Sequence, residues 1–276
     1  MTIKNRYSDL MPSPSVLTVL ACALYATSAV LAWRRQRLLT VAAALALTSH
    51  AGALSIELFL DGALHIGVSE ALSLFAWQSA LLLWVFSFRE PVAVNGVLIY
   101  PLAGMLAAAA ALLPSPRSAV EPLSWQVSLH ILISLLAAGV LTLAAVQAAA
   151  LAIQERLLRR HALASRSSHL PPLQLMERLL FQMVAVGFGL LSLTLLTGLW
   201  FVEDWMAQHL AHKTVLSIIA WIVFGVLLWG RWRYGWRGRI AIRWALSGYG
   251  ILILAYFGTK IILEQVLQKH WAWPGS

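Results

Sequence analysis

The chain has 276 residues, of which 60% are hydrophobic and only 11% are charged, and its formal net charge is +9 at pH 7. A soluble domain carries about 25% charged residues, so this composition excludes an ordinary water-soluble protein and indicates a surface that faces lipid. The positive charge does not indicate nucleic-acid binding, because the arginines lie in short loops between apolar segments, as in a membrane protein. The single cysteine, Cys22, excludes an internal disulfide, and no C-x-x-C-H sequence is present for a c-type haem.

A membrane-spanning helix needs roughly 20 mostly apolar residues. Eight segments of the chain meet this requirement. They cover residues of about 16–33, 38–60, 68–88, 92–113, 126–153, 175–201, 213–231 and 240–265. Arginines follow the first segment instead of preceding it, so we expect a retained helix and not a cleaved signal peptide. The sequence therefore predicts an all-α, polytopic membrane helix bundle with about eight transmembrane helices, forming a single transmembrane domain over residues 1–276.

Basic residues are concentrated in alternate loops, the pattern that places those loops in the cytoplasm. The loops after the first, third, fifth and seventh segments hold Arg34, Arg35, Arg37, Arg89, Arg156, Arg159, Arg160, Arg166, Arg231, Arg233, Arg237 and Arg239. The other loops hold only Arg117 and Lys213. Both termini are therefore expected outside, on the periplasmic side. The basic inner loops, above all residues 154–174, are expected to lie on anionic lipid headgroups.

One histidine lies deep inside a predicted span. His50 is about twelve residues into the second segment, near the middle of the membrane, and Glu57 follows seven residues later on the same helical face. Ionisable side chains at this depth are rare and tend to face the interior of the bundle. A neutral histidine hydrogen-bonded between helices is one interpretation, an iron ligand is the second, and a solute pathway using His50 and Glu57 is the third.

Two further histidines lie near the outer ends of predicted helices. His130 is just inside the fifth segment and His212 opens the seventh, so the topology gives them similar depth. Two neutral imidazoles facing each other across a gap are what a six-coordinate haem iron requires, and histidines that bond headgroups or water are the alternative. Trp200 and Trp205 lie among acidic residues and histidines between these segments. They are candidates for a wall against a flat apolar ligand, although most tryptophans here belong to the aromatic belt.

The chain resembles the cytochrome c assembly proteins, the CcsA, CcmC and HemX-like family, and within it the YpjD-like subgroup. The similarity extends over nearly the full length. It is carried by Ser49-His50-Ala51, Leu129-His130, Leu170-Pro171-Pro172-Leu173, Glu177-Arg178, Thr197-Gly198, Lys213 with Val215-Leu216-Ser217-Ile218, Trp221, Gly235-Trp236-Arg237-Gly238-Arg239 and Ala255-Tyr256-Phe257-Gly258. The glycine-tryptophan-arginine-glycine stretch is the more specific part of this pattern.

The resemblance implies haem handling at the outer face of a bacterial inner (plasma) membrane. His130 matches the family histidine that precedes a tryptophan-rich outer loop, and residues 198–213 occupy the place of that loop. The full W-G-x-x-W-x-W-D motif of the family is absent, and Trp200, Asp204 and Trp205 echo it. The ligand role of His212 follows from its position and not from the resemblance.

The sequence thus predicts an integral membrane protein that binds haem b and acts in haem handling or export for cytochrome c assembly. His130 and His212 are the expected axial ligands of the iron, and His50 is an alternative or transient ligand deeper in the membrane. No nucleophile, base and acid set indicates an enzyme. The alternative function is a HemX-like regulator or scaffold without a cofactor, which contacts a membrane partner of haem or cytochrome c biosynthesis through its basic inner loops.

Overall fold

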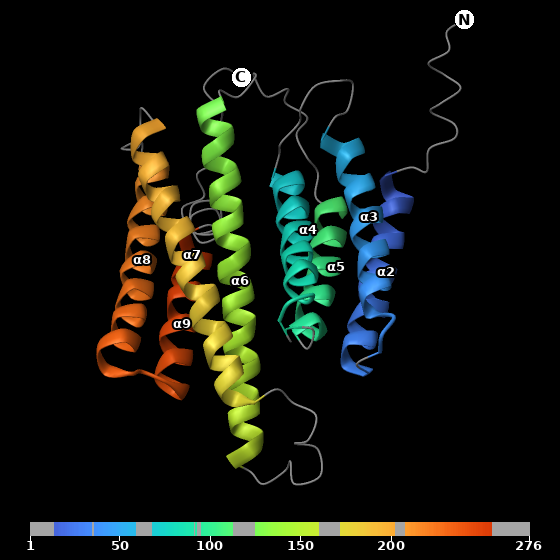
Figure 1. Ribbon diagram of the computed structural model, residues 1–276. Coiled ribbons are helices and arrows are strands. Elements are labelled where there is room, and N and C mark those ends of the chain that lie inside the picture. The colour runs from blue at the N-terminus through green and yellow to red at the C-terminus, as the bar shows by residue number, and fades with distance from the viewer. Residues whose placement is uncertain are drawn as a thin grey trace, which may run out of the picture. The chain divides into compact units, whose positions relative to one another are not determined.

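The computed structural model describes residues 14–34, 36–58, 68–90, 92, 95–112, 125–159, 172–201 and 208–255. Within these residues the chain forms eight α-helices and no strand, which confirms the predicted all-α fold (Figure 1). The helices are α2 (Pro14–Arg34), α3 (Leu39–Leu58), α4 (Val68–Phe86), α5 (Gly96–Leu112), α6 (Trp125–Arg159), α7 (Leu173–Phe201), α8 (Gln208–Tyr234) and α9 (Gly238–Ile253). Six of them are long and apolar enough to span a membrane, and α5 is a shorter apolar helix.

The helix boundaries differ from the sequence-based ones in two informative places. α6 continues to Arg159, about one and a half turns beyond the predicted end of its span, so its basic end extends past the apolar part. α8 already begins at Gln208, which puts His209 and His212 inside the helix and not in a preceding loop. The last part of the predicted eighth span, residues 256–265, lies outside the described residues.

The helices form two compact units, one within Met1–Ser124 and one within Trp125–Ser276. In the first unit α2 packs on α3, α3 on α4, α4 on α5, and α5 back on α2. In the second unit α6 packs on α7, α7 on α8, α8 on α9, and α9 back on α6. Each unit is therefore a closed ring of four helices joined in chain order, the simplest way to bury the inner faces of short-looped helices.

Small residues allow the closest helix contacts in both units. A Cβ atom at Gly104 of α5 would lie 3.5 Å from the Cβ atom of Tyr25 on α2. In the second unit, a Cβ atom at Gly187 of α7 would lie only 2.5 Å from Cδ2 of Leu141 on α6. Lipid tails are as apolar as leucine, so helices in a membrane associate through such close packing and through interhelical hydrogen bonds.

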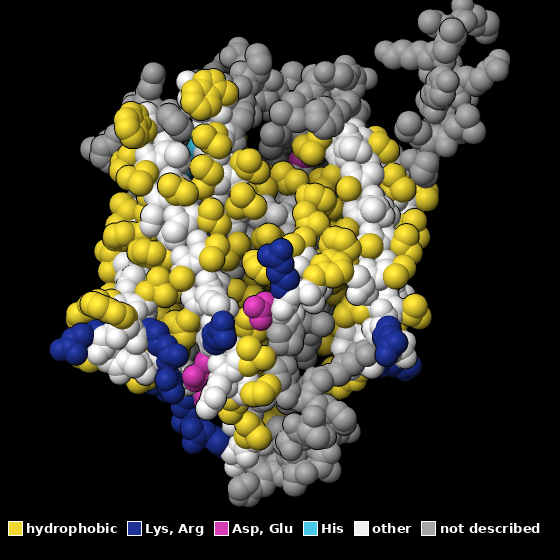
Figure 2. Space-filling view, viewed as in Figure 1, with side chains coloured by type: hydrophobic (Ala, Val, Ile, Leu, Met, Phe, Trp, Pro, Cys, Tyr) yellow, Lys and Arg dark blue, Asp and Glu magenta, His cyan; other side chains and the backbone are white. Residues whose placement is uncertain are grey.

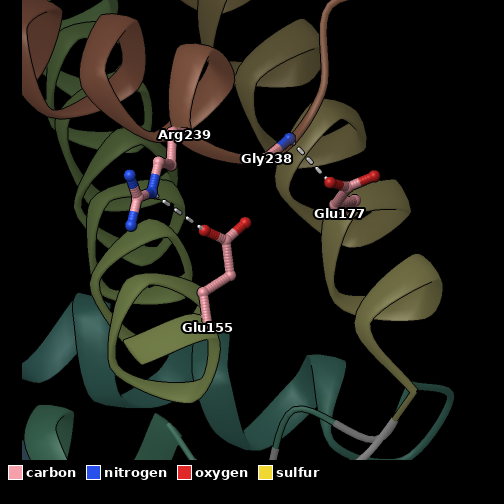
Figure 3. Close-up of polar contacts among 4 residues, drawn as sticks. All are labelled: Glu155, Glu177, Gly238 and Arg239. Atoms are coloured by element: carbon pink, nitrogen blue, oxygen red, sulfur yellow. Dashed lines mark hydrogen bonds and ion pairs between the residues drawn. The ribbon is translucent and has the colours of Figure 1, made fainter. Parts of the chain in front are cut away.

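The turn between α8 and α9 is built by the glycine-tryptophan-arginine-glycine stretch. Gly235 and Gly238 have φ angles of 65° and 54°, a region that side-chain-bearing residues rarely adopt. The backbone N–H of Gly238 donates to Oε1 of Glu177 at 2.7 Å, so a carboxylate from the first turns of α7 caps the start of α9 (Figure 3). Glu155, from the last turns of α6, lies beside it and faces Arg239 at 4.0 Å (Figure 3).

Apolar side chains cover much of the exposed surface of the described helices (Figure 2). Large apolar residues that are about half to two thirds exposed occur along the helices of both units, and they include Val19, Val41, Leu45, Val85, Leu193, Leu196, Val215 and Ile222. In water such a surface would be costly, whereas in a bilayer it faces hydrocarbon. This distribution and the six apolar helices confirm a multi-pass membrane protein. The sides on which its termini lie stay a prediction.

We predict that Gly187→Ala lowers the stability of the second unit, whereas Gly189→Ala does not. The added methyl at position 187 collides with Leu141, an overpacking change that costs about 1–3 kcal/mol. At Gly189 an added Cβ would meet no other side chain or neighbouring helix within 4 Å, and alanine favours the helix by about 1 kcal/mol over glycine. Equilibrium unfolding of both variants in detergent measures the difference. Equal stability of the two variants would contradict the close α6–α7 contact.

We also predict that Glu177→Ala destabilises the α8–α9 turn by about 1 kcal/mol, the usual contribution of a side-chain cap. Glu155→Gln should cost less, because its 4.0 Å ion pair involves an arginine side chain that is 61% exposed. Thermal unfolding in detergent compares the two variants. A larger loss for the Glu155 variant would show that the ion pair, and not the cap, holds this turn.

Candidate functional site

His50 lies in the interior of the first unit and uses both of its ring nitrogens. Its side chain is 1% exposed. The Nδ1 atom is 3.1 Å from the hydroxyl oxygen of Tyr25 on α2, and Nε2 is 3.0 Å from the hydroxyl oxygen of Ser73 on α4. A neutral imidazole donates from one nitrogen and accepts at the other, and both hydroxyls can take either role. His50 thus joins α2, α3 and α4 by side-chain hydrogen bonds.

Aromatic contacts complete this cluster. The ring of Tyr25 meets the His50 ring edge-on, with 5.7 Å between centroids, and stacks on Tyr100 of α5 at 6.2 Å. All four helices of the first unit therefore contribute to the surroundings of His50. This arrangement is the hydrogen-bonded interior histidine that the sequence offered as one interpretation. A role of His50 as an iron ligand is untested, and it would require breaking the bond to Tyr25 or to Ser73.

His130 lies in the second turn of α6, at the end where α7 finishes. Its Nδ1 atom is 2.9 Å from the hydroxyl oxygen of Thr197 on α7. That hydroxyl lies 2.8 Å from the carbonyl oxygen of Leu193 and 3.1 Å from that of Thr194, both in its own helix. The Thr197 hydroxyl has a single hydrogen, and it donates this hydrogen to the carbonyl oxygens of its own helix, as is usual for threonine in a helix. The hydrogen-bond network therefore assigns Nδ1–H as the donor to Thr197.

The second ring nitrogen of His130 is then the one with a lone pair. The Ser134 hydroxyl oxygen lies at the long distance of 3.5 Å from Nε2, and this hydroxyl donates to the His130 carbonyl oxygen at 2.7 Å. Among the described residues, Nε2 has no short hydrogen bond. Histidines that ligate metals have this arrangement, in which one ring N–H is held by a second group and the other nitrogen is available.

Gly198 allows the His130 ring to lie against the backbone of α7. A Cβ atom at this position would be 3.2 Å from Cε1 of the His130 ring, closer than carbon atoms normally approach. Thr197 and Gly198 thus fix the position of the ring together, one by a hydrogen bond and one by the absence of a side chain. Sequence reasoning treated Thr197-Gly198 as part of a family pattern and assigned it no role toward His130. The only sequence signal was a threonine-glycine pair at the outer end of an apolar helix.

The remaining candidate residues differ in how far the structure describes them. Trp200 lies near the end of α7, three residues after Thr197, and is 86% exposed. His212 lies in the second turn of α8, and its side chain is outside the described part of the chain, as is the whole of Trp205. α6 and α8 both start at the end of the second unit where α7 finishes (Figure 1). The backbone positions of His130 and His212 therefore lie toward the same end of this unit.

We predict that His50→Ala destabilises the first unit and leaves the hydrogen bond between His130 and Thr197 in place. The change leaves the hydroxyls of Tyr25 and Ser73 without their partner in an apolar interior, at a cost of about 1–3 kcal/mol. Thermal unfolding in detergent measures this cost, with the exposed Thr48→Ala on the same helix as the control. Unchanged stability of the His50 variant would contradict its structural role.

The sequence of this chain is similar to those of known proteins. The family model described as Cytochrome C assembly protein matches residues 38–267, which include parts of both compact units. The Inner membrane protein YpjD of Escherichia coli strain K12 is 32% identical over 236 residues, covering 85% of this chain and 89% of that protein. Whether residues 1–276 form one domain stays a prediction.

Shorter similarities link the chain to named assembly factors. The Cytochrome c biogenesis protein CcsA of Trichodesmium erythraeum is 26% identical over 100 residues, covering 36% of this chain and 28% of that protein. CcsA of Thermosynechococcus vestitus is 26% identical over 98 residues, covering 35% of this chain and 31% of that protein. No solved structure matches the chain significantly.

The extent of these matches decides the family. The family model covers well over half of the chain, and the YpjD similarity runs through most of both proteins. Together with six apolar helices, they confirm the predicted multi-pass protein of a bacterial inner membrane. The chain therefore belongs to the cytochrome c assembly protein family.

Proposed function

We propose that the protein binds haem b at the outer end of its second unit and acts in haem handling or export for cytochrome c assembly. His130 is the ligand to the iron, through Nε2. The protein captures and releases haem without making or breaking covalent bonds, so it is not an enzyme. When bound, haem would supply an iron that imidazole nitrogens such as Nε2 of His130 can ligate.

The hydrogen bond between His130 and Thr197 is the observation that carries this proposal. Because Nδ1–H donates to Thr197 at 2.9 Å, the ring is held as the tautomer whose Nε2 carries the lone pair. His50 uses both of its ring nitrogens, whereas Nε2 of His130 has no short partner among the described residues. The neighbouring Gly198 leaves space for the ring and keeps the imidazole in one orientation. The ligand is thus oriented before haem arrives.

The other members of the site are assigned by position. His212 is proposed as the second axial ligand, since the start of α8 lies at the same end of the unit as the start of α6. Trp200 is largely exposed next to this end and can cover an apolar face of the macrocycle, and Trp205 is proposed for the same role. The chain has one cysteine and no C-x-x-C-H sequence, which favours non-covalent haem b over attached haem c.

The family supports the same function. The CcsA relatives carry names that assign them to cytochrome c biogenesis, and the chain shares part of their sequence. The HemX-like alternative, a cofactor-free regulator or scaffold for a membrane partner, predicts that histidine substitutions leave the function unchanged. Haem binding by the purified protein separates the two functions.

We predict that the purified protein, loaded with haemin, shows a Soret band that weakens or shifts in His130→Ala. Thr197→Val should keep the fold but weaken haem affinity by about 10- to 100-fold, the usual effect of removing the partner of a metal-ligating histidine. Thr197→Ser retains the hydroxyl and should restore binding. Haemin titration followed by absorption spectroscopy measures these affinities.

Thr194→Val is the matched control for the threonine. It lies one turn earlier on α7, and its hydroxyl donates to the Leu190 carbonyl oxygen of its own helix. Haem affinity should be unchanged in this variant. If the wild-type protein stays colourless after loading, the proposed function is wrong. If it binds haem and Thr197→Val binds equally well, haem binding stands and the role of Thr197 is wrong.

A further inference from the structure

The turn that joins α8 to α9 concentrates positive charge and aromatic rings at one end of the second unit. We call residues 229–243 the arginine turn. This stretch contains five arginines and no acidic residue: Arg231, Arg233, Arg237, Arg239 and Arg243. It also contains three tryptophans and one tyrosine. Lysine and arginine side chains gather at this end of the unit, next to apolar side chains (Figure 2).

Some charged side chains of the arginine turn and its surroundings have partners within the protein, and others are exposed at its surface. Arg231 points inward, where it donates to the Trp236 carbonyl oxygen at 3.1 Å and its guanidinium lies 4.7 Å from the Phe181 ring centre. Glu177 is used by the backbone of Gly238, and Glu155 faces Arg239. The two nearby carboxylates thus serve the start of α9 and do not neutralise the outer arginines.

Besides Arg239, which faces Glu155, three arginines lie on the outside. The side chains of Arg233, Arg237 and Arg243 are exposed. Among the described residues, none of the three forms an ion pair. Three exposed guanidinium groups within eleven residues leave an uncompensated positive surface, which is complementary to a phosphate group.

The residues beside these arginines favour a lipid over an acidic protein as the occupant. Trp232 is 82% exposed and Tyr234 is 61% exposed, and such rings prefer the headgroup region of a bilayer. Exposed apolar side chains continue from the turn along both helices, with Trp229 and Ile222 on α8 and Ile240 on α9. A positive surface that borders an apolar one matches a molecule that has an anionic head and hydrocarbon tails.

We propose that the arginine turn is a binding site for an anionic phospholipid. Arg233, Arg237 and Arg243 hold the headgroup phosphate, and the exposed apolar side chains of α8 and α9 contact the acyl chains. The bound lipid holds this end of the second unit at the inner surface of the membrane. This site lies at the opposite end of α8 from His212 and does not depend on haem binding.

Native mass spectrometry of the detergent-purified full-length protein tests this site. Dioleoyl phosphatidylglycerol should form bound adducts, and the zwitterionic dioleoyl phosphatidylcholine should not. The variant R233Q/R237Q should weaken the phosphatidylglycerol adducts by about 30-fold, as expected for the loss of two arginine contacts with an anionic lipid. Both side chains are exposed, so the thermal midpoint of the variant should stay unchanged.

The control R34Q/R37Q removes two exposed arginines from the α2–α3 turn of the first unit, next to the exposed Trp33. It changes the net charge equally and should keep the lipid adducts. Equal losses in both variants would reduce the effect to general electrostatic attraction and overturn the site. Unchanged phosphatidylglycerol adducts in R233Q/R237Q would overturn it as well. If that variant keeps the lipid adducts and loses a co-purifying acidic protein, the occupant of the arginine turn is a protein and not a lipid.

Discussion

The structure depends on the requirement that polar groups inside a hydrocarbon layer find partners within the protein. Water is absent from that layer, so an unpaired polar side chain costs several kcal/mol. Some buried polar side chains of the described spans meet this requirement by bonds between helices, and others by bonds to carbonyl oxygens of their own helix. His50 is bonded to Tyr25 and Ser73, and Thr142 of α6 is 2.8 Å from the Tyr249 hydroxyl of α9. These bonds hold each ring of four helices in one register.

His130 differs from these groups, and the proposed function rests on that difference. One of its nitrogens is bonded to Thr197 like the other interior polar groups, whereas Nε2 has no short partner among the described residues. It lies near the end of the second unit that is opposite to the arginines, and Gly198 holds its ring against α7. The two ends of this unit therefore have different properties. One end carries His130 and the exposed Trp200, and the other carries exposed guanidinium groups.

Composition and apolar length predicted the helices well, because a lipid-facing helix must be apolar along about 20 residues. The positions of His50 inside its helix and of His130 near the start of its helix also followed from the sequence. The partners of these histidines did not. Thr197 is 67 residues from His130, and their contact depends on how α6 and α7 are aligned, which side-chain periodicity does not encode. The side chain of His212 lies outside the described residues, so its pairing with His130 remains a proposal.

Chemical rescue of a cavity variant tests the ligand role of His130 most directly. In His130→Gly, added imidazole can occupy the space of the missing ring and supply its nitrogen to the iron. Haem-loaded His130→Gly should lack the wild-type absorption spectrum and regain it when imidazole is added, whereas N-methylacetamide should have no effect. A His130→Gly protein whose haem spectrum matches the wild type without imidazole would contradict the assignment of His130 as the ligand.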